Sequence, residues 1–152
     1  MAQNSSAASH PLTAASHSTT GARAYTPAYQ AYQILHIAFT VAPLLAGADK
    51  FFHFLVNWDQ YLAPAMARML PVTGHTFMLG VGVIEMAAAL LVALAPAIGG
   101  WVVGAWLCGI IFNLLMIPAY FDVALRDLGL ALGAFALARL AAEFDHRRSV
   151  IR

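Results

Sequence analysis

The sequence predicts an all-α integral membrane protein, a four-helix bundle with its N- and C-termini both in the cytoplasm. The first observation behind this prediction is composition: of 152 residues, 61% are apolar and 10% are charged, whereas a soluble domain carries about 25% charged residues. The second is that the apolar residues form four long runs. So few charges cannot cover a water-facing surface, so we expect lipid to be the solvent.

The chain divides into two tails and one membrane domain. Residues 1–28 are rich in Ser, Ala and Thr, a composition that predicts a disordered cytoplasmic tail. The transmembrane domain covers 29–142, and residues 143–152 form a short basic cytoplasmic tail. The expected spans lie at about 29–56, 74–95, 101–120 and 123–142. At 1.5 Å per residue each can cross a hydrocarbon core of roughly 30 Å.

The connections between the spans carry loop signals. Residues 57–72 mix aromatic, charged and proline residues, as expected of an interfacial loop. Pro96 with Gly99 and Gly100 predicts a tight turn between the second and third spans. Because the last two connections are short, the last three spans should be antiparallel neighbours.

The distribution of Lys and Arg predicts the orientation. On one side lie Arg23, Arg139, Arg147, Arg148 and Arg152, and on the other lie Lys50, Arg68 and Arg126. Cytoplasmic loops carry the excess of positive charge. We therefore expect a multi-pass protein of the bacterial cytoplasmic (inner) membrane with both termini inside.

Polar residues within the spans gather in one half of the predicted bundle. The group consists of Asp49, Lys50, His53, His75, Glu85, Asn113, Arg126 and Asp127. Each charged side chain in a span costs at least ~2.5 kcal/mol, so these groups should meet one another and not face lipid. Three interpretations remain open: a structural ion-pair network, a cavity for a quinone-like headgroup or for protons, and haem or metal ligation.

Spacing indicates partners within this group. Asp49 and His53 are four residues apart and share a helix face, so the carboxylate can orient the imidazole. Lys50 points about 100° away and needs a different partner or must extend to the interface. Glu85 needs a cation, Lys50 or Arg126, or a proton. His53 and His75 lie at one depth, as ligands of haem b would, but two histidines alone are weak support, and no metal site is expected.

Three features of the sequence resemble a known family. They are the run Gly47-Ala48-Asp49-Lys50-Phe51, Glu85 midway along the second span, and the Arg126-Asp127 pair that opens the fourth. With these three features in this order, the chain is similar to the DoxX-like group of small four-helix bacterial membrane proteins, over roughly residues 30–142. The resemblance implies a bundle with both termini inside and an association with membrane redox chemistry, often beside another subunit. The long polar tail, His53, His75 and the segment 57–60 depart from the family pattern.

These observations favour an accessory membrane subunit of a respiratory or other redox complex that contributes to a quinone-accessible site. The alternative is a small proton-coupled carrier or permease. A non-catalytic subunit is favoured over an enzyme, because the chain has no zinc signature and no phosphate-binding loop. The expected partners are the bilayer and either other membrane subunits or further copies of this chain. Nucleic acid is excluded, because there is no basic stripe.

Overall fold

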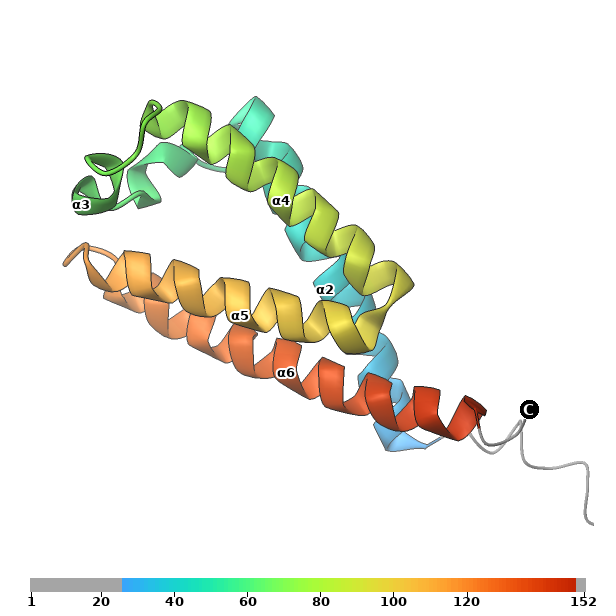
Figure 1. The fold of residues 1–152 in the computed structure, drawn as a ribbon. Helices are drawn as coiled ribbons and strands as arrows, with labels where there is room; N and C mark the ends of the chain where they lie inside the picture. Colours follow the sequence, from blue (N-terminus) through green and yellow to red (C-terminus); the bar gives the residue numbers. More distant parts are fainter. Residues whose placement is uncertain (1–25, 150–152) are drawn as a thin grey trace, which may run out of the picture.

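The computed structural model describes residues 26–149, with side chains described up to 144. Its long helices are α2 (Pro27–Phe52), α4 (Gly74–Leu94), α5 (Pro96–Leu115) and α6 (Phe121–Ser149). Between α2 and α4 lie the 3-10 helix η1 (Trp58–Tyr61) and the short helix α3 (Pro64–Ala67) (Figure 1). The predicted disorder of residues 1–25, and the placement of Arg152, fall outside the described residues.

The boundaries of α2 differ from the predicted ones because capping interactions determine where this helix begins and ends. α2 begins at Pro27, inside the predicted tail, because the Thr26 side chain caps the helix by accepting a hydrogen bond from the backbone N–H of Tyr29. It ends at Phe52, not at residue 56. His53 follows in the left-handed conformation, with φ of 54°, and closes the helix with a backbone hydrogen bond to the Asp49 carbonyl.

The predicted turn at Pro96 and Gly99-Gly100 is wrong. Pro96 is the first residue of α5, a position whose backbone N–H would have no partner within the helix, so proline fits there. Both glycines lie inside the helix. The third helix therefore covers 96–115 instead of 101–120, and α6 begins at Phe121 and continues to Ser149. Proline and glycine predicted a connection here, but both residues suit the start of a tightly packed helix.

Three helices, α2, α4 and α5, are long and apolar enough to cross a membrane. Large apolar side chains point outward from them and from the segment after α2; Phe52 is 80% exposed, Phe54 90% and Leu94 76%. Lipid can cover such an apolar surface without a free-energy cost, whereas its exposure to water is unfavourable. The chain therefore has the properties of a membrane protein, and the fourth crossing, through α6, stays a prediction.

The helices pack as two pairs, α2 with α4 and α5 with α6. The pairs lie close together where α4 turns into α5 and diverge toward the end that carries α3 (Figure 1). All four long helices contribute to the apolar core, which contains Phe39, Ala88, Val92, Val103, Ala134 and Leu137. Because this core fills the closed end, the open end is held by other contacts.

Glycines let the paired helices touch backbone to backbone. A Cβ added to Gly47 of α2 would lie 2.6 Å from the carbonyl oxygen of Gly82 in α4, and one added to Gly82 would lie 2.7 Å from the Gly47 oxygen. In the other pair, a Cβ on Gly100 would lie 2.8 Å from the Ala134 oxygen. Small residues at such crossings are typical of membrane helices.

We expect Gly82→Ala to destabilise the protein by about 1–3 kcal/mol, because the added methyl group meets a backbone oxygen that cannot move aside. Thermal unfolding in detergent would measure this. Gly80→Ala is the matched control, since its Cβ has nothing within 4 Å and the same exchange in an open helix position is neutral or favourable. Equal stability of the two variants would contradict the crossing.

Candidate functional site

Asp49 organises the chain where α2 ends. Its carboxylate accepts hydrogen bonds from the backbone N–H groups of Phe54 and Leu55, at 2.9 and 3.0 Å. It also accepts one from the Trp58 indole N–H at 2.7 Å. The side chain of Asp49 therefore folds the segment after α2 back over the helix end. The predicted pairing of the Asp49 carboxylate with the His53 imidazole is not formed, because these donors take the carboxylate.

Trp58 links Asp49 to Lys50. While its N–H bonds to Asp49, its ring face covers the Lys50 ammonium, with Nζ 3.8 Å from the ring centroid. A cation over an indole face is stabilised by the ring quadrupole, more strongly when water is excluded. Lys50 is 3% exposed, so the aromatic ring replaces part of the hydration that the ammonium has lost.

The centre of the site is the ion pair between Lys50 and Glu85. Nζ of Lys50 donates to Oε2 of Glu85 at 2.6 Å, and the two side chains are 3% and 11% exposed. The crossing of α2 and α4 at Gly47 and Gly82 brings both residues to one level. Of the two cationic partners expected for Glu85, the structure places Lys50 there.

Two further groups lie near the Glu85 carboxylate. The indole N–H of Trp106, on α5, interacts with it but forms no regular hydrogen bond, and this buried nitrogen has no partner among the described residues. Asp127 on α6 is 8% exposed and lies within electrostatic range of Glu85. All four long helices therefore send a polar side chain to this site, which we call the buried polar site: Asp49, Lys50, Trp58, Glu85, Trp106 and Asp127.

An apolar groove adjoins the buried polar site. It has a volume of about 390 Å³ and runs between α4 and α5, lined by Ile84, Ala88, Val102, Ala105 and Trp106. Trp106 belongs to both features, because its ring forms part of the groove wall and its N–H points toward the charged groups. A molecule in the groove would meet aliphatic side chains and the Trp106 ring, whose N–H lies beside the Glu85 carboxylate.

Four residues of the predicted polar group lie apart from the site, and the first two are Asn113 and Arg126. Asn113 holds the loop after η1, donating to the Tyr61 carbonyl at 2.6 Å and accepting from the Ala63 N–H at 2.9 Å. Arg126 is exposed, with its Nε 3.8 Å from the Asp127 carboxylate. Arg126 is therefore not the counter-ion of Glu85, because its position at the start of α6 leaves the side chain free to reach outward.

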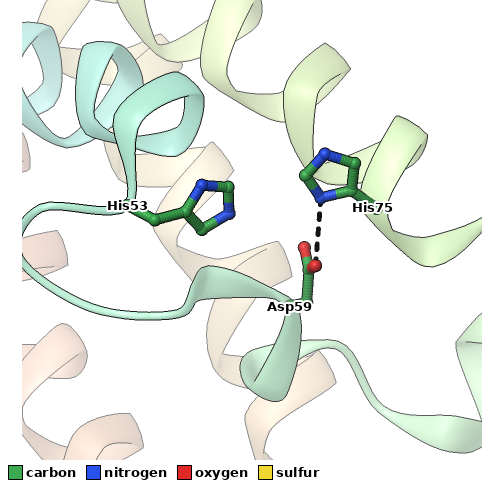
Figure 2. A group of neighbouring side chains, drawn as sticks. All are labelled: His53, Asp59 and His75. Carbon is green, nitrogen blue, oxygen red and sulfur yellow. Dashed lines mark hydrogen bonds and ion pairs between the residues drawn. The ribbon is translucent and has the colours of Figure 1, made fainter.

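His53 and His75 form a second group with Asp59, at the ends of α2 and α4 (Figure 2). Their rings stack with centroids 5.5 Å apart and planes inclined by 21°. Axial ligation of haem needs a ring nitrogen on each face of the porphyrin, and two stacked rings do not offer this arrangement. The two histidines are neighbours at the ends of adjacent helices, with an aspartate beside them.

The roles of Trp58, Asp59 and Trp106 were not predicted from the sequence. Trp58 and Asp59 sit in a loop whose composition indicated only an interface, and Trp106 matched an ordinary membrane-helix aromatic. The available signal for Trp58 was the pair of charged residues Asp49 and Lys50 just upstream, because buried charges need hydrogen-bonding or charged partners.

Comparison with protein-family models, with curated proteins and with solved structures finds no match to this chain. Chemically, the buried polar site can hold a proton on a carboxylate, donate a hydrogen bond from Trp106, and stabilise a partial negative charge beside Lys50.

Lys50→Met should destabilise the protein by about 3–5 kcal/mol, because it leaves the Glu85 carboxylate buried without its cation. Lys50→Met combined with Glu85→Gln should recover most of the loss, since no uncompensated charge remains. Thermal unfolding of the single and double variants in detergent measures both effects.

Arg126→Ala serves as the control for this pair, because its side chain is 69% exposed and surface ion pairs contribute little. The free energy of unfolding of this variant should stay within about 0.5 kcal/mol of that of the unaltered protein. If the double variant were as unstable as Lys50→Met alone, the ion pair would not be what holds the site.

Proposed function

We propose that the protein is an accessory membrane subunit of a respiratory or other redox complex and that the groove between α4 and α5 receives a quinone. The observation that carries the proposal is the Trp106 indole N–H. It is buried, lies beside the Glu85 carboxylate and yet forms no regular hydrogen bond among the described residues, and it stands where the apolar groove meets the Lys50–Glu85 pair. A buried donor without an acceptor is rare and points to a missing ligand.

The groove suits a quinone in size and lining. Ligand sites of about 300–1,000 Å³ with apolar walls and few polar groups are usual for small molecules, and this groove of about 390 Å³ has aliphatic walls and a single indole donor. A quinone carbonyl oxygen can accept from Trp106, while its ring and isoprenoid tail contact Ile84 and Val102. Lipid-soluble ligands can enter from the side of the protein, because the groove is open.

The charged pair gives the site a role in proton transfer. Reduction of a quinone to a quinol consumes two electrons and two protons, and Glu85 is a protonatable side chain that interacts with Trp106 of the groove wall. Lys50 stabilises the negative charge that develops on the quinone oxygen during reduction. The electrons come from a partner subunit with its own redox centre, as the DoxX-like resemblance implies.

The same proposal places α6 as a fourth crossing of the bacterial inner membrane, with both termini in the cytoplasm. Two charged groups at the start of α6, Asp122 and Arg126, lie at the end of the molecule where α5 ends and can sit at the interface. Arg139 and the basic residues beyond it then lie at the cytoplasmic end, in accord with the positive-inside bias.

Protein purified in mild detergent should retain a quinone and a redox subunit, detected by solvent extraction with chromatography and by mass spectrometry. Trp106→Phe should keep the groove wall and lower quinone affinity about 2- to 10-fold, the effect of losing one hydrogen bond of about 0.5–1.5 kcal/mol. Equilibrium binding of a short-chain quinone measures the affinity.

Trp101→Phe is the matched control, because Trp101 is 52% exposed, packs on Phe135 and lies outside the groove. It should bind quinone like the unaltered protein. A solitary protein without quinone, or equal affinity in the two tryptophan variants, would overturn the proposal.

A second candidate is a proton-coupled carrier. The observation in its favour is the excess of buried acid, because Glu85 and Asp127 share the interior with Lys50 as the one buried cation of the described residues. Such an excess favours taking up a proton or a cationic substrate.

In this case Glu85→Gln, which keeps the size and a hydrogen-bonding side chain, should abolish pH-driven uptake in liposomes. Asp122→Asn, at an exposed position, is the control and should leave uptake unchanged. Uptake by Glu85→Gln equal to that of the unaltered protein would remove the carrier function.

A further inference from the structure

Three segments bring metal-ligating side chains together next to the ends of α2 and α4. His53 follows the last turn of α2, Asp59 lies in η1, and His75 is in the first turn of α4. In Figure 2 the Asp59 carboxylate points into the space between the two imidazole rings. These residues lie outside the buried polar site and have no role in the proposed quinone chemistry.

The distances within the group suit a cation. One ligand atom from each of the three residues lies within 4.8 Å of the others, and Nδ1 of His75 is 3.0 Å from Oδ2 of Asp59. In a tetrahedral zinc site, bonds of about 2.0–2.1 Å separate neighbouring ligand atoms by roughly 3.3 Å. The His75–Asp59 distance is already close to this value, and the ligand atom of His53 lies within 4.8 Å of the other two.

A second observation points to a ligand. Oδ1 of Asp59 is buried and has no hydrogen-bond partner among the described residues, although the rest of the side chain is 35% exposed. The His75 contact uses the other oxygen, Oδ2. A buried carboxylate oxygen without a donor is costly, and a bound cation would supply the missing partner.

We propose that His53, Asp59 and His75 bind a divalent transition-metal ion, with Zn²⁺ as the ion that this ligand set suits best. Two imidazoles and one carboxylate are a known set of three protein ligands for zinc, which leaves a fourth position for water or another ligand. Mg²⁺ and Ca²⁺ prefer oxygen ligands and are disfavoured by two imidazoles. This inference is independent of the proposed quinone site.

Metal binding would join the end of α2 to the start of α4 through η1. His53 holds its ring at this place because the chain leaves α2 there in a left-handed turn. The neighbouring residue of η1, Trp58, covers Lys50, so the ion would also restrain the aromatic cover of the buried polar site.

The test uses the full, untagged chain in detergent, stripped of metal with a chelator and then titrated with Zn²⁺ in equilibrium dialysis. Co²⁺ in place of Zn²⁺ gives a visible absorption spectrum that reports the coordination geometry. We expect one ion per chain and a rise in the unfolding temperature on adding Zn²⁺.

Three variants remove the ligands one at a time: His53→Gly, Asp59→Asn and His75→Gln. Glycine suits the φ of 54° at position 53 without strain, and both His53 and His75 are exposed, so these two changes should not unfold the protein. Each variant should weaken Zn²⁺ binding by more than the 10- to 100-fold that loss of an outer-shell partner costs.

Two controls locate the site. His36→Gln alters a half-buried histidine that contacts the Val92 carbonyl near the other end of α4, and His10→Ala with His17→Ala removes two histidines near the N-terminus. Both should bind Zn²⁺ like the unaltered chain. The proposal is overturned if the Asp59 and His75 variants, shown to be folded by circular dichroism, bind Zn²⁺ as tightly as the unaltered protein, or if the control without His10 and His17 loses binding.

Discussion

The buried ion pair between Lys50 and Glu85 is the interaction on which the arrangement of this protein depends. Neither charge can be left in an apolar medium without a partner, because the cost of desolvation is several kcal/mol for each ion. The two residues come from different helices and meet at 2.6 Å. The register of α2 against α4 is therefore fixed by charge as well as by the glycine crossing one turn away.

The segment between α2 and α4 contacts the Lys50–Glu85 pair at the end of the molecule where the two helix pairs diverge. Asp49 ends α2 by accepting two backbone N–H groups and the Trp58 indole, and Trp58 then covers the Lys50 ammonium. The same segment reaches the other helix pair through Asn113, which bonds to the backbone at Tyr61 and Ala63. Polar contacts thus hold the end where the helices diverge, while apolar packing holds the end where they meet.

The helical class and the long apolar segments could be predicted from the sequence, because composition and the length of apolar runs depend on the solvent and not on tertiary contacts. The sequence also indicated Lys50 as one of two possible cationic partners of Glu85, because a buried carboxylate needs a cation or a proton, and the structure forms that pair. It failed at Pro96 and Gly99, where the same residue types suit either a turn or a helix start packed against a neighbour. Only the neighbouring helix decides between those two outcomes.

The role of Trp58 could not be predicted for a related reason. Its ring covers Lys50 and its N–H donates to Asp49 only because the chain turns back at His53. That turn depends on a residue in the left-handed conformation, which non-glycine residues seldom adopt. A histidine persists there because the Asp49 carboxylate captures the next two N–H groups. The buried charge thus determines the loop, and the loop geometry is a consequence of the helix that precedes it.

The two polar groups of the molecule are connected through η1. Consecutive residues of this short helix face different partners, since Trp58 contacts Asp49 and Lys50 whereas Asp59 contacts His75. A shift of η1 by one residue would move Trp58 away from Lys50 and leave the ammonium without its aromatic cover. The placement of η1 is therefore constrained by both groups at once.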